Sequence, residues 1–430
     1  MAGKRRGVHR PRRVDPGLTV RKSEFYRDAR SDLSGPLSGL RVVEATTTWA
    51  GPMCSCLLAD MGADVIKVEH PRGEVARHVP PAVPHTQPPI SAMQATVNRN
   101  KRSLALDLAA PAGREVFLRL VASADVVVEN FRPGTLDRLG LSWSALRAMK
   151  QDLVLVSISG YGQFGRDCER AGYDPLAQAA AGFLSLNGSP EGEPVKAPTF
   201  LGDDLAGLHA AVAALGALRH RDRTGEGQHV DVSLLDAMLF QNPGYLTLGA
   251  LGADLPRLGN EFRIAAPATT YRCRDGLVMA GVLLDSHWKI LAALIGRPEL
   301  ADDPGYATAA ARIARRDAVN QMLAEWMARH EVAEVLQSFA EAGLPAAPVR
   351  TYREAAADPH VRDREMLQPV DIEGNRRVPV VGPVAKFSRT PTRVRTGAPA
   401  LGADSDAILE ELGVDADERD ALRRDGVLGA

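Results

Sequence analysis

Leu40-Arg-Val-Val-Glu-Ala45 and Ala63-Asp-Val-Ile-Lys-Val-Glu69 are two short apolar runs that lie on either side of Gly51-Pro52. Apolar runs of this length are typical of buried strands. Proline is tolerated in the first turn of a helix, so Gly51-Pro52 predicts a helix that extends to Met61 and ends at Gly62. A strand, a helix and a second strand in this order form a parallel pair with a right-handed crossover.

The same alternation continues along the chain and predicts an α/β fold with an open parallel sheet. Further strands are expected at 104–108, 125–129, 153–159 and 229–233, and helices at 111–124, 135–139, 144–150 and 175–186. Asp125-Val-Val-Val-Glu129 has a continuous apolar centre, as a strand buried on both faces should have. The turn Thr46–Ala50 contains no G-x-G-x-x-G, which argues against an NAD or FAD site.

In open parallel sheets, ligands bind at the loops that follow the carboxyl ends of the strands. Four such loops are predicted, at 46–51, 69–77, 130–134 and 160–165, and each contains glycine. We therefore expect a phosphate-bearing ligand to lie across them.

Composition excludes several classes of protein. The 430 residues are 45% hydrophobic and 24% charged, with a formal net charge of −1, so no global field favours a nucleic acid or a membrane. No run approaches about 18 apolar residues, the length of a membrane span. Four cysteines match neither a disulfide framework nor paired zinc-ligand spacing, and Cys54 and Cys56 fit core packing. A cytoplasmic protein without a metal is expected.

The first 22 residues carry eight Lys or Arg against a single acid, Asp15. They contain no apolar core of a secretory signal, and Pro11 and Pro16 break the amphipathic pattern of a transit peptide. We expect a disordered basic tail that takes no part in catalysis.

Asp203 and Asp204 open a long apolar run, Leu205 to Leu218, which predicts a buried helix. One carboxylate can be the N-cap while the other favours the helix dipole. Alternatively, one is a nucleophile that the helix N-terminus keeps ionised. The residues alone leave both interpretations open.

Many spaced motifs give the chain a resemblance to the class III CoA-transferases, the family of the formyl-CoA and carnitine CoA-transferases and of alpha-methylacyl-CoA racemase. The matching stretches include Ala50-Gly-Pro52, Leu58-Ala-Asp-Met-Gly-Ala-Asp-Val-Ile-Lys-Val-Glu69, Asn98-Arg-Asn-Lys-Arg-Ser103, Val128-Glu-Asn-Phe-Arg-Pro-Gly134 and Arg223-Thr-Gly-Glu-Gly-Gln228, within a match from about Pro36 to Gly413. The resemblance implies a Rossmann-like large domain built from both chain ends, a smaller α+β domain and an interlocked homodimer.

The resemblance also implies the site. Asp203 falls on the family's nucleophilic aspartate, and Tyr173 and Asp174 fall in the substrate pocket. Coenzyme A contacts are expected at Thr47, Thr48, Trp49, Ala50, His70, Arg77, Leu106, Asn130, Phe131 and Arg138. Coenzyme A or acyl-CoA is then a substrate and no cofactor is permanently bound.

The expected function is transfer of coenzyme A from an acyl-CoA donor to a carboxylate acceptor through acyl-aspartyl anhydrides and an aspartyl-CoA thioester. A 2-methylacyl-CoA racemase of the same fold is the alternative. The racemases carry His-Asp where this chain has Tyr173-Asp174, and tyrosine, with a pKa near 10, is a poor base at neutral pH. A third possibility is a non-catalytic CoA-binding protein. Formyl transfer is disfavoured because Arg257–Tyr271 contains only Gly259 in place of a glycine run.

Five segments are predicted. They are a basic tail at 1–35, the first part of the large domain at 36–225, a linker at 226–268, the small domain at 269–343, and a return linker with the rest of the large domain at 344–430.

Overall fold

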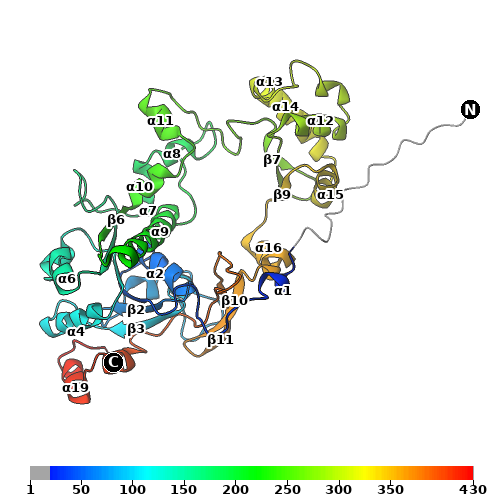
Figure 1. The fold of residues 1–430 in the computed structure, drawn as a ribbon. Helices are drawn as coiled ribbons and strands as arrows, with labels where there is room; N and C mark the ends of the chain where they lie inside the picture. The colour runs from blue at the N-terminus through cyan, green and yellow to red at the C-terminus, as the bar shows by residue number, and fades with distance from the viewer. Residues whose placement is uncertain (1–19, 430) are drawn as a thin grey trace, which may run out of the picture. The chain divides into compact units, whose positions relative to one another are not determined.

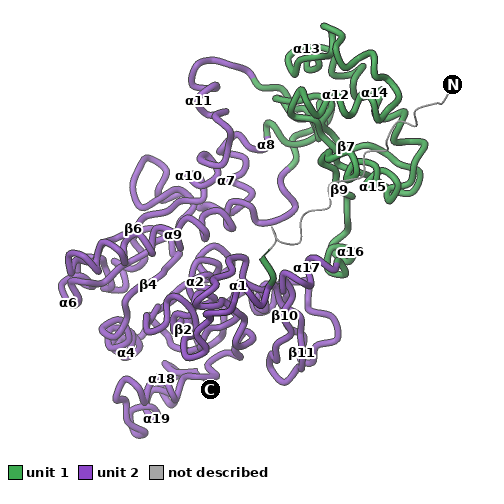
Figure 2. The backbone as a smooth tube through the Cα atoms, turned by 45° about the vertical axis from the view of Figure 1, so that its right-hand side comes forward, with its two compact units in different colours: residues 1–21, 185–195, 255–358 green, residues 22–184, 196–254, 359–430 purple. Residues whose placement is uncertain are grey.

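The computed structural model describes residues 20–429, so most of the predicted basic tail lies outside the described residues. The chain divides into two compact units (Figure 2). The larger unit contains 22–184, 196–254 and the residues from 359 onward, and the smaller unit contains 185–195 and 255–358.

A six-stranded parallel sheet organises the larger unit. Its strand order is β3-β2-β1-β4-β5-β6, the order of a doubly wound sheet. The strands are β1 (Arg41–Ala45), β2 (Asp64–Glu69), β3 (Lys101–Ala105), β4 (Val126–Glu129), β5 (Val154–Ser159) and β6 (His229–Ser233). The predicted α/β class and the parallel pair β1–β2 are therefore confirmed.

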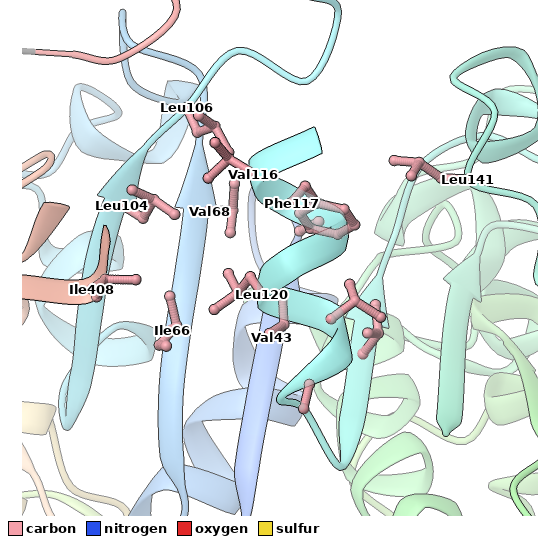
Figure 3. Packing of buried hydrophobic residues seen from close by; sticks show 14 of the residues in the cluster. Val43, Ile66, Val68, Leu104, Leu106, Val116, Phe117, Leu120, Leu141 and Ile408 are labelled. Atoms are coloured by element: carbon pink, nitrogen blue, oxygen red, sulfur yellow. The ribbon is translucent and has the colours of Figure 1, made fainter. Parts of the chain in front are cut away.

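Helices cover both faces of this sheet (Figure 1). The helices on one face are α4 (Pro111–Ala122), α6 (Trp143–Met149), α18 (Ser405–Glu411) and α19 (Ala416–Arg424). The helices on the other face are α2 (Ala50–Asp60), α7 (Asp174–Ala180), α9 (Leu201–Thr224) and α10 (Leu234–Phe240). Phe117 and Leu120 of α4 lie against Val43, Ile66 and Leu104 of three strands (Figure 3). Adjacent strand residues face opposite layers, so the strands are apolar throughout their centres.

Helix α9 is long and apolar enough to cross a membrane by length and composition alone. This differs from the sequence expectation that no run reaches that length. Its alanines, including Ala206, Ala210 and Ala214, are fully buried against α2 and the sheet. The place of α9 in the core of the larger unit thus explains these alanines, whereas Leu208 and Val212 of the same helix are exposed.

The smaller unit contains a three-stranded antiparallel sheet with helices packed against it. The strands are β7 (Ala268–Arg272), β8 (Leu277–Gly281) and β9 (Ala346–Pro348). The helices are α12 (Asp285–Leu294), α13 (Ala309–Ala314), α14 (Arg316–Met327), α15 (Val332–Ala342) and α16 (Tyr352–Ala357). Trp288, Trp326 and Phe339 fill its core.

The remaining elements of the larger unit include α1 (Lys22–Phe25), α3 (Ala92–Val97), α5 (Thr135–Arg138), α11 (Tyr245–Ala250), α17 (Pro359–Asp363) and the hairpin β10 (Leu367–Ile372) with β11 (Asn375–Val381). The boundary between the two units falls inside α8 (Phe183–Leu186), after Leu184. Helix α1 falls inside the segment predicted as a disordered tail, where Lys22 forms an ion pair with Glu365 at 2.6 Å.

The unit boundaries differ from the predicted ones. Residues 226–254, predicted as linker, belong to the larger unit because β6 pairs with β5 at the edge of the sheet. Residues 346–348, predicted as a return linker, pair with β8 in the smaller unit. The predicted helix 175–186 is broken at Gly182, whose φ of +79° separates α7 from α8.

Candidate active site

The strand order reverses between β1 and β4, and the loops that follow these two strands meet at this point. Thr47 donates its backbone N–H to the Asn130 side-chain oxygen at 2.8 Å, and the Asn130 amide nitrogen donates to the Thr47 carbonyl at 2.8 Å. The loops after β1 and β4 are thereby fixed to each other. Such a switch point is where doubly wound sheets bind their ligands.

A cavity of about 290 Å³ lies beside these loops, and Asp203 is one of its lining residues. Asp203 is the third residue of α9, which begins at Leu201 and has Phe200 as its N-cap. The interpretation that Asp203 or Asp204 caps the helix is therefore wrong.

Asp174 performs the capping role from a neighbouring helix. One carboxylate oxygen accepts the Gly202 backbone N–H at 2.6 Å, and the other accepts the Gln178 amide at 2.7 Å. The residue is only 3% exposed. A buried carboxylate thus satisfies an amide that would be unpaired at the start of a helix.

The two aspartates of α9 have different surroundings. The Asp204 carboxylate accepts a hydrogen bond from the Trp49 indole N–H at 2.6 Å. Burial raises the pKa of Asp203 to about 7, with the carboxylates of Asp174 and Asp204 adding to the effect. The shift is in the opposite direction to the expected effect of a helix N-terminus, which would favour the ionised carboxylate.

A second cavity, of about 410 Å³, opens beyond the carboxyl ends of β1 and β2. Thr47 and Phe131 line both cavities. The two spaces therefore adjoin at these residues. Val68, Val75 and Leu106 form an apolar part of the wall of the second cavity.

Most of the residues that sequence reasoning singled out gather around these two cavities. Thr47, Thr48, Ala50, Asn130, Phe131, Tyr173, Asp174 and Asp203 line the smaller cavity, and Thr47, His70, Leu106 and Phe131 line the larger one.

Trp49, Arg77 and Arg138 are not among the residues that line either cavity. Trp49 reaches the site indirectly through Asp204. Arg77 is paired with Glu69, the Nε–Oε2 distance being 2.8 Å, and Arg138 donates to the Thr135 hydroxyl at 2.8 Å.

Sequence reasoning missed two cations in the Asp203 cavity, Arg132 and Arg170. Arg132 belongs to the loop 130–134, which is one of the four loops predicted to bind a ligand. Arg170 carried no signal, because it lies in an irregular segment before α7. Its side chain is 65% exposed, and its guanidinium is 3.3 Å from the Asp167 carboxylate and 5.5 Å from the centre of the Tyr161 ring.

Within residues 20–429, no group of three or more His, Cys, Asp and Glu side chains is arranged to hold a metal ion. Cys54 and Cys56 are buried in the core of the larger unit, and burial raises the pKa of both thiols. Their role is packing, as predicted.

Comparison with known proteins identifies the family. The model of CoA-transferase family III matches residues 37–405. The chain belongs to CoA-transferase family III. It is an enzyme of the CoA-transferase class, and members of this class use CoA thioesters as substrates.

The relatives agree with this assignment over nearly their whole length. The succinyl-CoA:mesaconate CoA-transferase of Haloarcula hispanica is 38% identical over 88% of this chain and 97% of its own. The succinate–glutarate CoA-transferase of Agrobacterium fabrum is 36% identical over 88% and 96%. A crystal structure of a CaiB/BaiF family protein from Brucella suis is 37% identical, with a TM-score of 0.78, and covers 88% of this chain and 100% of that one.

Proposed function

We propose that this chain transfers coenzyme A between dicarboxylic acids and that Asp203 carries the acyl group and then coenzyme A covalently. The observation that carries the proposal is the Asp203 cavity, which combines a half-buried carboxylate with the guanidinium groups of Arg132 and Arg170. A carboxylate nucleophile and cations for a second carboxylate are what this reaction requires.

The mechanism follows from the chemistry of a carboxylate beside a thioester. An Asp203 oxygen attacks the carbonyl of the donor acyl-CoA, and the C–S bond breaks to give an acyl-aspartyl anhydride and CoA thiolate. The thiolate then attacks the aspartyl carbonyl and releases the donor acid, leaving an aspartyl-CoA thioester. The acceptor carboxylate attacks this thioester and the same two steps run in reverse.

The surroundings of Asp203 suit these steps. In the first turn of α9, the Gly202 N–H is bonded to Asp174 and the Asp204 N–H to the Phe200 carbonyl. The backbone N–H groups of Leu201 and Asp203 are therefore the ones of this turn that we assign to the developing oxyanion. Burial keeps water away from the anhydride, which water would hydrolyse. The Asp203 carboxylate also becomes a better nucleophile when its negative charge is poorly solvated.

The two cavities suggest how acyl-CoA binds. Because they adjoin at Thr47 and Phe131, we place the nucleotide end in the larger cavity, beside His70, and the thioester in the smaller one. The Phe131 side chain then separates the adenosine end from the reacting carbonyl.

The dicarboxylate preference rests on Arg132 and Arg170. A planar guanidinium binds a carboxylate through two parallel hydrogen bonds, so each arginine suits the carboxylate of an acid that remains free while the other reacts. Two relatives are named for succinate, mesaconate or glutarate transfer, which supports the same class of substrate.

The covalent role is tested at Asp203 with its neighbour as the control. Asp203→Ala should abolish transfer and the hydroxylamine-sensitive acyl adduct, which mass spectrometry of the intact protein detects. Asp204→Ala, which loses the bond to Trp49 and a minor influence on the pKa of Asp203, should form the adduct and cost about 1 kcal/mol of stability. Equal activity loss in both variants without an adduct would contradict the assignment.

Incorporation of deuterium from D2O separates transfer from racemisation. Racemisation needs two bases of suitable pKa on opposite faces of the alpha carbon. Tyr173 stands where a racemase has histidine. Both oxygens of the Asp174 carboxylate already accept hydrogen bonds, one from the Gly202 N–H and one from the Gln178 amide. A branched acyl-CoA in D2O should therefore gain almost no alpha-deuterium, and rapid incorporation without an acceptor would favour the racemase.

The acceptor class is tested with succinyl-CoA and a panel of mono- and dicarboxylic acids. Dicarboxylates should be preferred, and Arg170→Gln should raise their KM about tenfold, the loss of about 1.4 kcal/mol. The KM for monocarboxylates should be unchanged in this variant. Arg166→Gln, an exposed arginine of the same segment outside the cavity lining, is the matched control. An unchanged preference in Arg170→Gln would refute the anchoring role.

A further inference from the structure

The turn that connects β1 with α2 forms part of the wall of both cavities. Thr47 lines both spaces, and Thr48 lines the one that contains Asp203. Any ligand that occupies the two cavities together must pass this turn. The path of the backbone here therefore decides how such a ligand is held.

Thr48 has an unusual backbone conformation, with φ of +69°. This left-handed region is unfavourable for residues other than glycine, and most of all for a β-branched residue. A conformation of this kind persists only where the surrounding structure imposes it.

The side chain of Glu74 contacts the backbone of Thr48 directly. One oxygen of its carboxylate accepts the Thr48 backbone N–H at 2.6 Å, and the side chain is only 4% exposed. The other oxygen is 2.9 Å from the ammonium group of Lys67. A hydrogen bond from a backbone amide to a buried carboxylate is stronger than one between neutral groups.

Lys67 is fully buried and joins Glu74 to the carboxyl end of β1. Its ammonium group lies 2.9 Å from the Glu44 carboxylate and donates to the Thr46 carbonyl at 3.0 Å. Glu44 is in turn paired with the buried Lys101 at 2.6 Å. Burial disfavours the charged form of Lys67, but the carboxylates of Glu44 and Glu74 raise its pKa.

We propose that Glu74, held in place by Lys67, is a positioning residue that keeps Thr48 in the left-handed conformation and so shapes the turn for coenzyme A. Replacing a buried set of paired charges with apolar side chains is often neutral or stabilising, so stability alone gives little reason for Lys67 and Glu74 at this place. The proposal depends on the proposed function only in taking coenzyme A as the ligand.

The test uses the fact that glycine adopts a φ of +69° without help. Glu74→Ala should weaken binding of coenzyme A about tenfold, measured by calorimetry with coenzyme A as the titrant, which corresponds to about 1.4 kcal/mol. Its kcat at saturating substrate should stay within about twofold of the wild type, since Asp203 is untouched. Thr48→Gly is the reference for the double variant, because both lack the Thr48 side chain in the cavity wall. Glu74→Ala/Thr48→Gly should bind nearly as well as Thr48→Gly and clearly better than Glu74→Ala.

Asn130→Ala is the matched control, because Asn130 holds Thr47 rather than Thr48. Thr48→Gly should not rescue this variant. If the double variant Glu74→Ala/Thr48→Gly binds no better than Glu74→Ala, the carboxylate acts in another way and the proposal is overturned. Equal rescue of Asn130→Ala would overturn it as well.

Thr48→Pro keeps the test valid if Glu74→Ala does not fold. Proline fixes φ near −65° and has no N–H, so the turn cannot take its present form, while the buried charges stay in place. Affinity for coenzyme A should fall at least tenfold, and unchanged affinity would overturn the proposal. A wild-type enzyme that binds no coenzyme A would instead refute the proposed function, which is a distinguishable result.

Discussion

At the scale of single residues, the proposed chemistry depends on three carboxylates near the start of α9. Asp174 bonds to Gly202 and Asp204 bonds to Trp49, while burial, with these two carboxylates adding to the effect, raises the pKa of Asp203 to about 7. Asp174 and Asp204 thus each form a hydrogen bond within the protein and also raise the pKa of Asp203. The pKa of the proposed nucleophile is thus raised by its burial and by these two neighbours.

This arrangement predicts a pH dependence. Asp203 attacks as a carboxylate, so kcat/KM should rise with pH through about 7 as the group loses its proton. Asp174→Asn removes the neighbouring charge that raises the pKa of Asp203 most, while its amide oxygen can still accept the Gly202 N–H. The acidic limb of the profile should therefore move to lower pH.

Asp204→Asn removes a smaller influence on Asp203 and should move the same limb less. Circular dichroism across the pH range separates these shifts from unfolding. An acidic limb that stays at the same pH in Asp174→Asn would show that this carboxylate does not control Asp203.

At the scale of elements, the close packing of α2 on α9 decides where Asp203 lies. A Cβ atom added at Gly207 would be 2.8 Å from the Ala50 carbonyl oxygen and 2.9 Å from the Met53 Cβ. Ala50 itself lines the Asp203 cavity. The two helices can approach this closely only because Gly207 has no side chain.

Two glycines of α9 give a matched pair of substitutions. Gly207→Ala should lower stability by about 1–3 kcal/mol through overpacking, and it should also reduce transfer because α2 must move. Gly216 is exposed, and a Cβ there would meet nothing within 4 Å. Gly216→Ala should therefore raise stability by about 0.5–1 kcal/mol and leave transfer unchanged. Chemical denaturation measures the stability of both variants, and equal changes in stability would refute the packing argument.

At the scale of the whole molecule, the larger unit leaves many large apolar side chains exposed on three successive helices. They are Leu208 and Val212 of α9, Phe240 of α10, and Leu246 and Leu248 of α11, with Leu251 immediately after it. Exposed apolar surface of this extent is typical of an interface between proteins. We propose that a second copy of the chain covers it, in line with the expected homodimer.

The dimer is tested by light scattering coupled to size exclusion. The wild type should elute with twice the chain mass of 46.1 kDa. Phe240→Asp/Leu251→Asp should weaken association, since both side chains are at least 73% exposed in the single chain and a buried unpaired charge is costly. Glu226→Gln, an exposed substitution on the same unit, should not. A monomeric wild type would contradict the proposal.

The alternation of apolar runs and helix signals was sufficient to predict the parallel sheet, because local periodicity reports which faces are buried. It also marked the loops after β1 and β4, and the aspartate at the start of α9. It did not predict that β6 closes the edge of the sheet, since a short polar strand such as His229–Ser233 has the same local pattern inside a domain as in a linker.

The tertiary structure alone shows which groups assist Asp203. Trp49 and Asp204 are 155 residues apart in the sequence, and Asp174 is 28 residues from Gly202. The burial that raises the pKa of Asp203, and the charges that hold Thr48 left-handed, likewise come from segments distant in the chain. Periodicity carries no information on such pairs, because they form only when folded elements bring their side chains together and exclude water.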